Sequence, residues 1–253
     1  MSCKTHCYCS RVGSDRPLQV HGHRGARAVR PENTLAAFQY AIAVGADAIE
    51  MDVAVTRDGV PVIAHDAHLE SLDSRPAIRE LSLADVRRMA PDIPTLDEAL
   101  ELAARGAFLF NIEIKSFPGR ADLAPAPERF TELVLERIRR HGVARRALVQ
   151  SFDFRVLHAF AGLAPEIPRA AIFDRPDGDF AAIARRAQAG AVAPEFHLAT
   201  PANVTCAHQA GLAVFAWTAN RPEDWRRLID ARVDAIVTDD PAALLEYLAH
   251  LVR

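Results

Sequence analysis

The sequence comprises 253 residues, of which 50% are hydrophobic and 25% charged, and its formal net charge is −3. This apolar fraction supplies a sizeable core, so the composition excludes a chain that is disordered throughout. A near-neutral charge with a slight excess of acids argues against a nucleic-acid-binding protein, which would carry a basic stripe. The length permits one large domain or two small ones.

Residues 1–17 are polar and aperiodic, without the apolar run of a secretory signal. Cys3, Cys7 and Cys9, together with His6, are candidate metal ligands, but their spacing does not match a structural metal site. We therefore expect residues 1–17 to form a disordered tail. Cysteine usage and the lack of any stretch of about 18 apolar residues predict a cytoplasmic protein without an integral membrane segment.

From residue 18 onward, short apolar runs rich in β-branched residues alternate with helix-length amphipathic segments. Asn33 precedes the first predicted helix as a cap, and Gly45 and Gly211 are typical of residues that close helices. Pro222 and Pro241 lie near the starts of the last two helices, where proline is tolerated. The predicted strands are 18–23, 47–55, 60–64, 108–114, 147–151, 169–174, 191–195, 213–218 and 235–239.

The link between the second and third predicted strands decides the architecture. Residues 56–59 are too few for a parallel crossover, which takes about a dozen residues or more, and their Asp-Gly pair is typical of a hairpin turn. The strand at 60–64 is therefore expected to run antiparallel outside the barrel. We predict an α/β fold, a single (β/α)8 TIM barrel over residues 18–253 with a short antiparallel hairpin strand after strand 2. An open doubly wound sheet is the alternative, but no G-x-G-x-x-G motif follows a strand.

Carboxylates within two predicted strands indicate a metal site. Glu50 and Asp52 are two residues apart and project from the same side of one strand, and Glu113 lies within another. Unpartnered carboxylates are costly to bury. Three that converge in a barrel offer the hard oxygen ligands of Mg²⁺ or Ca²⁺ rather than Zn²⁺. The alternative is that they form ion pairs with nearby basic side chains, namely Arg24, Lys115 and Arg57.

Two histidines end predicted strands, on the face where barrel active sites lie. They are His23, after the first strand, and His65, after the hairpin strand. Beside a metal, such a pair suits general acid and general base roles near neutral pH, although a single His at a strand end is more often structural. Arg24 and Lys115 add the positive charge that a phosphate needs. His21 is expected deeper in the barrel, as a core histidine.

Short motifs around these residues occur in a fixed order. The first group is His23-Arg24-Gly25, Pro31-Glu32-Asn33-Thr34, Glu50-Met51-Asp52, Thr56-Arg57-Asp58-Gly59 and His65-Asp66. Weaker motifs follow: Glu113-Ile114-Lys115, Ser151-Phe152-Asp153, Trp217-Thr218-Ala219-Asn220 and 233–239. In order and spacing they resemble the signature of the glycerophosphodiester phosphodiesterase family, over about residues 18–245.

The resemblance implies a (β/α)8 barrel with one divalent cation, Mg²⁺ or Ca²⁺. The family's metal ligands map onto three acids: Glu50, Asp52 and Glu113. Its catalytic histidines map onto His23 and His65. Its phosphate-contacting residues map onto Arg24 and Lys115. Trp217 lines the substrate pocket by similarity, although barrel packing explains it equally well.

The sequence also departs from the family's pattern. No Arg-Thr pair follows His65-Asp66, and Arg232 stands where the last motif normally has Gly. Neither departure touches the proposed ligands or catalytic residues, but the first bears on which head group is accepted.

The resemblance implies metal-dependent hydrolysis of a small phosphodiester, a glycerophosphodiester, to sn-glycerol 3-phosphate and an alcohol. We expect His23 to act as the base and His65 as the acid, with either water or the substrate's own hydroxyl attacking. One alternative is a lysophospholipase D-type hydrolase, which predicts an exposed apolar rim near the pocket. Another is a catalytically inactive ligand-binding barrel, which retention of both histidines and all three acids disfavours. Unrelated metal barrels share the fold alone.

Overall fold

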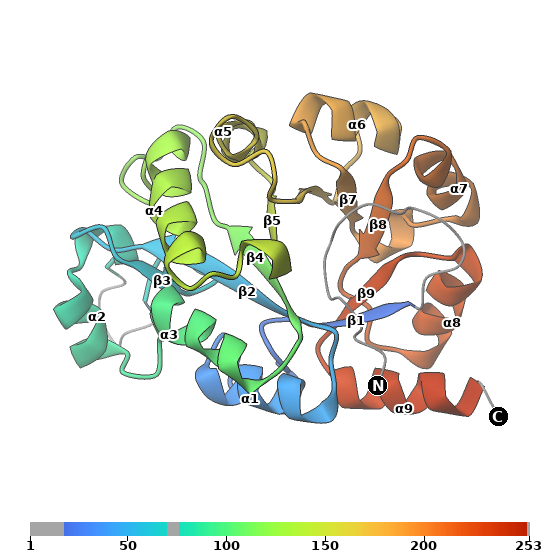
Figure 1. The fold of residues 1–253 in the computed structure, drawn as a ribbon, viewed down its shortest axis with the longest axis horizontal. Helices are drawn as coiled ribbons and strands as arrows, with labels where there is room; N and C mark the ends of the chain where they lie inside the picture. The colour runs from blue at the N-terminus through green and yellow to red at the C-terminus, as the bar shows by residue number, and fades with distance from the viewer. Residues whose placement is uncertain (1–17, 70–75, 252–253) are drawn as a thin grey trace.

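Short strands rich in alanine, valine and isoleucine pair side by side and close into a ring surrounded by helices (Figure 1). The computed structural model describes residues 18–69 and 76–251, so the predicted tail and its cysteines lie outside the described residues. The ring closes because β1 pairs in parallel with both β2 and β9. Its strands are β1 (Gln19–Gly22), β2 (Ala48–Val55), β4 (Leu109–Ile114), β5 (Ala147–Ser151), β6 (Arg169–Phe173), β7 (Ala191–Pro194), β8 (Ala213–Ala216) and β9 (Ala235–Thr238).

The remaining strand, β3 (Pro61–Ile63), pairs antiparallel with the end of β2 and lies outside the ring. The turn before it is held by Thr56, whose hydroxyl donates to Asp58 Oδ1 at 2.6 Å and accepts from Val60 N at 3.0 Å. Gly59 completes the turn at a φ of 80°, a region that favours glycine. The hairpin prediction is confirmed, and with it the (β/α)8 barrel.

Helices link the strands and cover the outside of the ring (Figure 1). Prolines open the last two at the predicted places, and Gly45 and Gly211 adopt positive φ angles of 92° and 77° after α1 and α7. The helices are α1 (Leu35–Val44), α2 (Leu83–Met89), α3 (Leu96–Leu100), α4 (Pro127–Arg140), α5 (Phe154–Leu163), α6 (Phe180–Ala187), α7 (Pro201–Gln209), α8 (Pro222–Ala231) and α9 (Pro241–Leu251).

The cap predicted for the first helix is wrong by one residue. Thr34, in extended conformation, accepts a hydrogen bond from Ala37 N at 3.2 Å and so caps α1. Asn33 instead takes a φ of 56° and turns its side chain toward β2. Thr34 therefore caps the helix, whereas its neighbour Asn33 contacts β2 inside the barrel.

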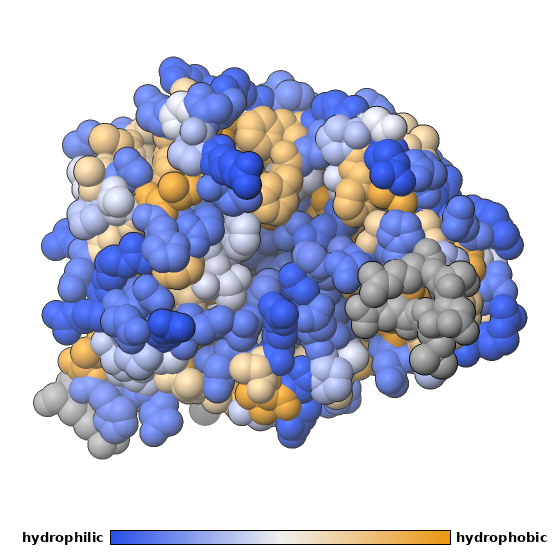
Figure 2. Space-filling model, turned by 180° about the vertical axis from the view of Figure 1, so that it is seen from behind, coloured by the Kyte–Doolittle hydropathy of each residue, from blue (hydrophilic) through white to orange (hydrophobic). Residues whose placement is uncertain are grey.

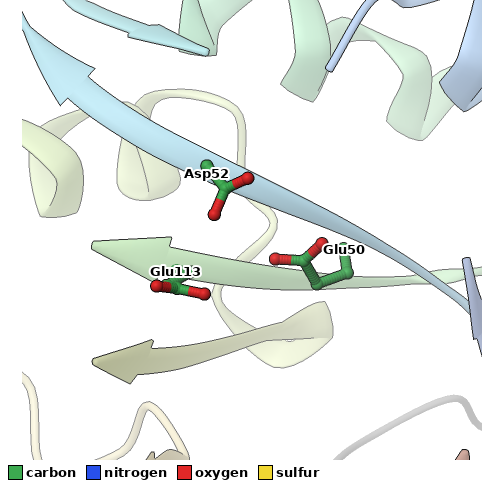
Figure 3. Close-up of side chains that lie close together, drawn as sticks. All are labelled: Glu50, Asp52 and Glu113. Atoms are coloured by element: carbon green, nitrogen blue, oxygen red, sulfur yellow. The ribbon is translucent and has the colours of Figure 1, made fainter. Parts of the chain in front are cut away.

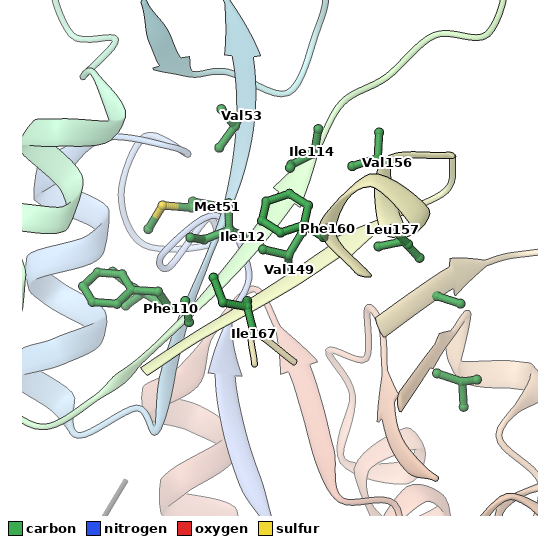
Figure 4. Close-up of a cluster of buried hydrophobic side chains, with 14 of the residues drawn as sticks. Met51, Val53, Phe110, Ile112, Ile114, Val149, Val156, Leu157, Phe160 and Ile167 are labelled. Carbon is green, nitrogen blue, oxygen red and sulfur yellow. The ribbon is translucent and has the colours of Figure 1, made fainter. Parts of the chain in front are cut away.

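Alternation along the strands separates two apolar layers. Outward-facing side chains such as Met51, Ile112 and Val149 pack against the helices, as Figure 4 shows for Leu157 and Phe160 of α5. A smaller cluster of strand residues fills the inside of the ring: Leu148, Ala170, Ile172, Ala191, Ala193, Phe215 and Ala235. The same alternation turns the carboxylates of β2 away from the helices.

His21 lies inside the ring, fully buried, with its ring centroid 5.7 Å from that of Phe215. Burial lowers the pKa of His21 to about 3, so its imidazole is neutral. The prediction of a core histidine is confirmed.

The face of the molecule in Figure 2 is largely hydrophilic, with its hydrophobic patches separated from one another. No helix in the described ranges 18–69 and 76–251 combines the length and apolar character needed to span a bilayer.

Candidate active site

Three carboxylates meet inside the ring because β2 and β4 are neighbours in matched register. Asp52 lies opposite Glu113 across the two strands, and Glu50 is two residues before Asp52 on the same side. Each of the three offers a carboxylate oxygen, and these oxygens all lie within 4.8 Å of one another (Figure 3). The side chains are buried, with Glu50, Asp52 and Glu113 only 2%, 1% and 8% exposed. The predicted convergence of the three acids is therefore observed.

The three acids titrate differently because their neighbours differ. Burial, reinforced by the charges of Asp52 and Glu113, raises the pKa of Glu50 well above its ordinary value. Burial and the Asp52 carboxylate raise the pKa of Glu113 to about 7, outweighing its contact with Lys115. Asp52 is also buried, but Lys115 and Arg24 hold its pKa below the ordinary value. The metal-free cluster therefore resists full ionisation, because burial and mutual repulsion of the carboxylates outweigh the nearby cations at Glu50 and Glu113.

Two of the three predicted basic partners contact the acids. Lys115 Nζ lies 3.0 Å from Asp52 Oδ1 and 2.5 Å from Glu113 Oε1, and Arg24 Nε lies 3.3 Å from Asp52 Oδ2. Arg57 does not take part, because its guanidinium faces Asp85 instead. The ion-pair alternative thus holds for Asp52 and Glu113, whereas no ion pair among the described residues involves Glu50.

The turn after β1 presents its backbone to the acids. Arg24 takes a φ of 48° and donates its backbone N–H to Glu50 Oε2 at 2.7 Å. Gly25 follows at a φ of 87°, and a Cβ there would lie 2.6 Å from the backbone carbon of Ala37. Only glycine fits at this close approach of the turn to α1.

His23 is held by a residue from the far end of the chain. Its Nδ1 lies 2.6 Å from Asp239 Oδ1, just beyond β9, and Asn220 donates to the other oxygen of that carboxylate at 2.8 Å. Although burial opposes ionisation, the hydrogen bond from His23 keeps the pKa of Asp239 below its usual value. This carboxylate fixes the orientation of the imidazole ring through Nδ1.

Two further residues, neither of which sequence reasoning placed in the site, contact Asp52 or its partner Arg24. Asn33 donates from Nδ2 to Asp52 Oδ2 at 2.8 Å, and its Oδ1 accepts from Asp52 N at 3.3 Å. Glu32 accepts from the Arg24 guanidinium at 2.6 Å and draws it toward α1. Their place in the Pro31–Thr34 motif was the only signal of these contacts.

His65 lies in a cavity of about 220 Å³ that also reaches Glu113 and Lys115. Its Nδ1 lies 2.8 Å from Asp66 Oδ1, and burial together with the Lys115 charge lowers its pKa. The structure therefore brings three predicted site residues into a single cavity: the histidine His65, the carboxylate Glu113 and the cationic Lys115.

Aromatic side chains form the outer edge of this cavity. Phe152 lines it and is 46% exposed, and its ring meets the Trp217 ring edge-on at 5.7 Å. The Trp217 indole is fixed by donating to Ala193 O at 2.6 Å. Trp217 thus packs against Phe152 but is not among the residues that line the cavity.

The donor set fits a divalent cation. If all three carboxylates are ionised, as metal ligands must be, they outnumber the two cationic side chains that contact them, and Arg24 also pairs with Glu32. The donors are all oxygens, the ligands that Mg²⁺ and Ca²⁺ take in proteins. Among the described residues, this is the group of acids, histidines or cysteines found close enough together to hold a metal.

Comparison with known proteins agrees with this geometry. Residues 23–243 match the profile of the Glycerophosphoryl diester phosphodiesterase family. The glycerophosphodiester phosphodiesterase of Caldanaerobacter subterraneus subsp. tengcongensis is 32% identical over 250 residues, covering 92% of this chain and 97% of that protein. A crystal structure from Silicibacter pomeroyi shares 32% identity and a TM-score of 0.87, covering 94% of this chain and 95% of that one.

A second solved structure holds a product. It is a phosphodiesterase of Oleispira antarctica in complex with sn-glycerol-3-phosphate, with 26% identity and a TM-score of 0.81, covering 91% of this chain and 96% of that one. The chain belongs to the glycerophosphoryl diester phosphodiesterase family and is, as a member, a phosphoric diester hydrolase.

Proposed function

We propose that this protein hydrolyses glycerophosphodiesters to sn-glycerol 3-phosphate and an alcohol, with one divalent cation, Mg²⁺ or Ca²⁺, bound by Glu50, Asp52 and Glu113. The observation that carries the proposal is the buried cluster of three carboxylates beside a cavity lined by His65, Glu113 and Lys115. The product held by the Oleispira antarctica relative supports the substrate class. When bound, such an ion supplies Lewis-acid stabilisation of the phosphoryl oxygens.

Arg24 and Lys115 are the proposed phosphate-binding residues. Both are already held in place by Asp52, so each presents its remaining donors without having to be ordered on binding. The phosphodiester carries one negative charge, and these cations stabilise the further charge that develops as the attacking oxygen adds to phosphorus.

The two histidines are the proposed proton-transfer groups. His23, with Nδ1 held by Asp239, takes the proton of the attacking oxygen at Nε2 as that oxygen bonds to phosphorus. His65 gives a proton to the leaving alcohol as the other P–O bond breaks. The lowered pKa of His65 makes its protonated form give up the proton more readily, while reducing the fraction of His65 that is protonated near neutral pH.

Identification of the products tests the proposal. Glycerophosphocholine is incubated with the full chain and Mg²⁺ or Ca²⁺, and phosphorus NMR records the products. We expect sn-glycerol 3-phosphate and choline, since His65 protonates the alcohol that leaves. Release of phosphocholine and glycerol, or no turnover with any divalent ion, would contradict the assignment. A transient cyclic phosphate would identify the substrate's hydroxyl as the attacking group.

A lysophospholipid substrate is the second candidate, favoured by exposed Phe152 at the cavity edge. Such a hydrolase would release choline from lysophosphatidylcholine at a rate comparable to that from glycerophosphocholine. Turnover of glycerophosphocholine but not of lysophosphatidylcholine would exclude the lysophospholipid candidate.

A cytoplasmic location stays a prediction from cysteine usage.

A further inference from the structure

Four polar side chains, not three, form the deep end of the site. Across β2 and β4, Asp52 lies opposite Glu113 and Glu50 lies opposite Asn111. Neighbouring strands lie about 4.8 Å apart in a sheet, so these side chains on one face are adjacent. Three corners of this square carry the carboxylates already described, and the fourth is the amide of Asn111, which is fully buried.

The Asn111 amide is oriented by the histidine beneath it. His21 Nε2 lies 3.1 Å from Gln19 Oε1, which accepts its proton, and Asn111 Nδ2 lies 3.5 Å from His21 Nδ1. Because the His21 imidazole is neutral, Nδ1 is the acceptor in this arrangement. The amide nitrogen therefore faces His21, and the carbonyl oxygen lies on the opposite side of the planar amide.

That carbonyl oxygen has no donor. Asn111 Oδ1 is buried, and no hydrogen-bond partner for it is found among the described residues. Leaving such a group unsatisfied costs about 1–3 kcal/mol. Arg24 Nε also makes no hydrogen bond, but it lies 3.3 Å from Asp52 Oδ2 in an ion pair, so Asn111 Oδ1 is the unsatisfied acceptor beside the acid cluster.

We propose that Asn111 supplies, through Oδ1, a neutral fourth oxygen ligand to the cation bound by Glu50, Asp52 and Glu113. Mg²⁺ and Ca²⁺ take at least about six oxygens, among them amide carbonyls. A neutral ligand adds an oxygen without adding to the repulsion among three buried carboxylates. The inference rests on the cation of the proposed function and adds a residue to its coordination.

Ion affinity gives the first readout. Calorimetric titration of the metal-free full chain with MgCl₂ and with CaCl₂ compares wild type with Asn111→Leu, which keeps the volume and removes the oxygen. We expect the affinity to fall about tenfold or more. Thr131→Val is the matched control, because it removes another buried oxygen without a partner, on α4 away from the acids. Its affinity for both ions should equal that of wild type.

The number of waters on the ion gives a second readout that a purely structural role would not move. Tb³⁺ replaces Ca²⁺, and luminescence lifetimes in H₂O and D₂O count its bound waters. Asn111→Leu should gain one water, whereas Asn111→Asp, which retains an oxygen, should keep the wild-type count. Asn111→Ala replaces the leucine variant if thermal melting shows that the latter is unfolded.

The outcomes separate this inference from the proposed function. Unchanged affinity in Asn111→Leu, or weaker binding with an unchanged water count, overturns the role of Asn111 and leaves the three-acid site intact. Failure of the wild-type chain to bind either ion contradicts the proposed cation itself.

Discussion

Glu50 is the residue whose environment most requires a cation. It is buried, the charges of Asp52 and Glu113 repel it, and its only anchor among the contacts described is the Arg24 backbone N–H. Its pKa in the folded state is raised, so the metal-free protein binds an extra proton there relative to the unfolded chain. Stability of the metal-free protein is therefore lost as pH rises through the ordinary carboxyl range toward the raised value.

Glu50→Gln should make the metal-free protein more stable at pH 8. The amide still accepts the Arg24 N–H but carries no charge, so the free energy of unfolding at pH 8 should rise, in the direction set by the raised pKa of Glu50. Urea unfolding in a chelator at pH 5 and pH 8 measures it. The variant should show a smaller loss between the two pH values than wild type. A lower stability at pH 8 would show that Glu50 is not electrostatically strained.

Asp239 holds His23, the proposed base, through Nδ1. Asp239→Asn leaves the ring without its carboxylate partner, so we expect kcat to fall by about 100-fold or more while KM and ion affinity stay near wild type. Asp234→Asn is a matched control, because Asp234 pairs with His208 at 2.9 Å, before β9 rather than after it. A kcat loss of similar size in both variants would indicate a structural effect.

The pH profile assigns the role of His65. His65 Nδ1 donates a hydrogen bond to the Asp66 carboxylate, which partly offsets the burial and the Lys115 charge that lower the pKa of His65. Asp66→Asn should therefore lower this pKa further. A general acid must be protonated, so the alkaline limb of kcat/KM should move to lower pH. A shift of the acidic limb instead would make His65 the base.

At the scale of a single element, the residue that ends α8 has a backbone conformation that non-glycine residues rarely adopt. Arg232 follows the helix at a φ of 65°, a left-handed conformation that glycine adopts without strain. The family's late motif has glycine at this position. Arg232→Gly should therefore raise stability by about 1 kcal/mol, or about 2–4 °C in Tm.

Gln188 provides the comparison for that prediction. It ends α6 at a φ of 51° and is likewise exposed, so Gln188→Gly should raise Tm by a similar amount. Calorimetry of both variants checks the effect. A lower Tm in both would show that side-chain contacts at these caps outweigh backbone strain.

Strands and turns were predictable from the sequence where the residues within them determine the local structure. The strands are within two residues of the predicted bounds, because each is a short apolar run closed by turn residues. The hairpin followed from the length of 56–59 and from its Asp-Gly pair. The cap of α1 was missed because Asn33 and Thr34 are both good capping residues. Only the structure shows that Asn33 binds Asp52 and that Thr34 caps the helix.

At the scale of the whole molecule, closure of the barrel brings together site residues that are far apart in the sequence, and these contacts could not be predicted. Glu50, Asp52 and Glu113 were predictable because strand alternation marks them. Asp239 was not, since it meets His23 across 216 positions of sequence. The carbonyl oxygen of Asn111 is likewise recognisable only once the register of β2 and β4 is known.

The cation is also expected to stabilise the whole barrel, because it binds the folded chain at residues from two strands. At a concentration about 100 times Kd, a ligand of the folded state adds about 2.7 kcal/mol. Thermal melting of wild type with and without MgCl₂ or CaCl₂ should show this increase in Tm. An unchanged Tm at saturating ion would mean that the acids hold no cation in the folded state.

The most direct measurement of the central claim is glycerophosphocholine hydrolysis as a function of free Mg²⁺ or Ca²⁺, for wild type and Glu113→Gln. We expect wild-type turnover to vanish in a chelator and return on adding ion, and the variant to remain folded and inactive throughout. Full activity of wild type in chelator, or a wild-type rate in Glu113→Gln, would contradict a catalytic cation at these three carboxylates.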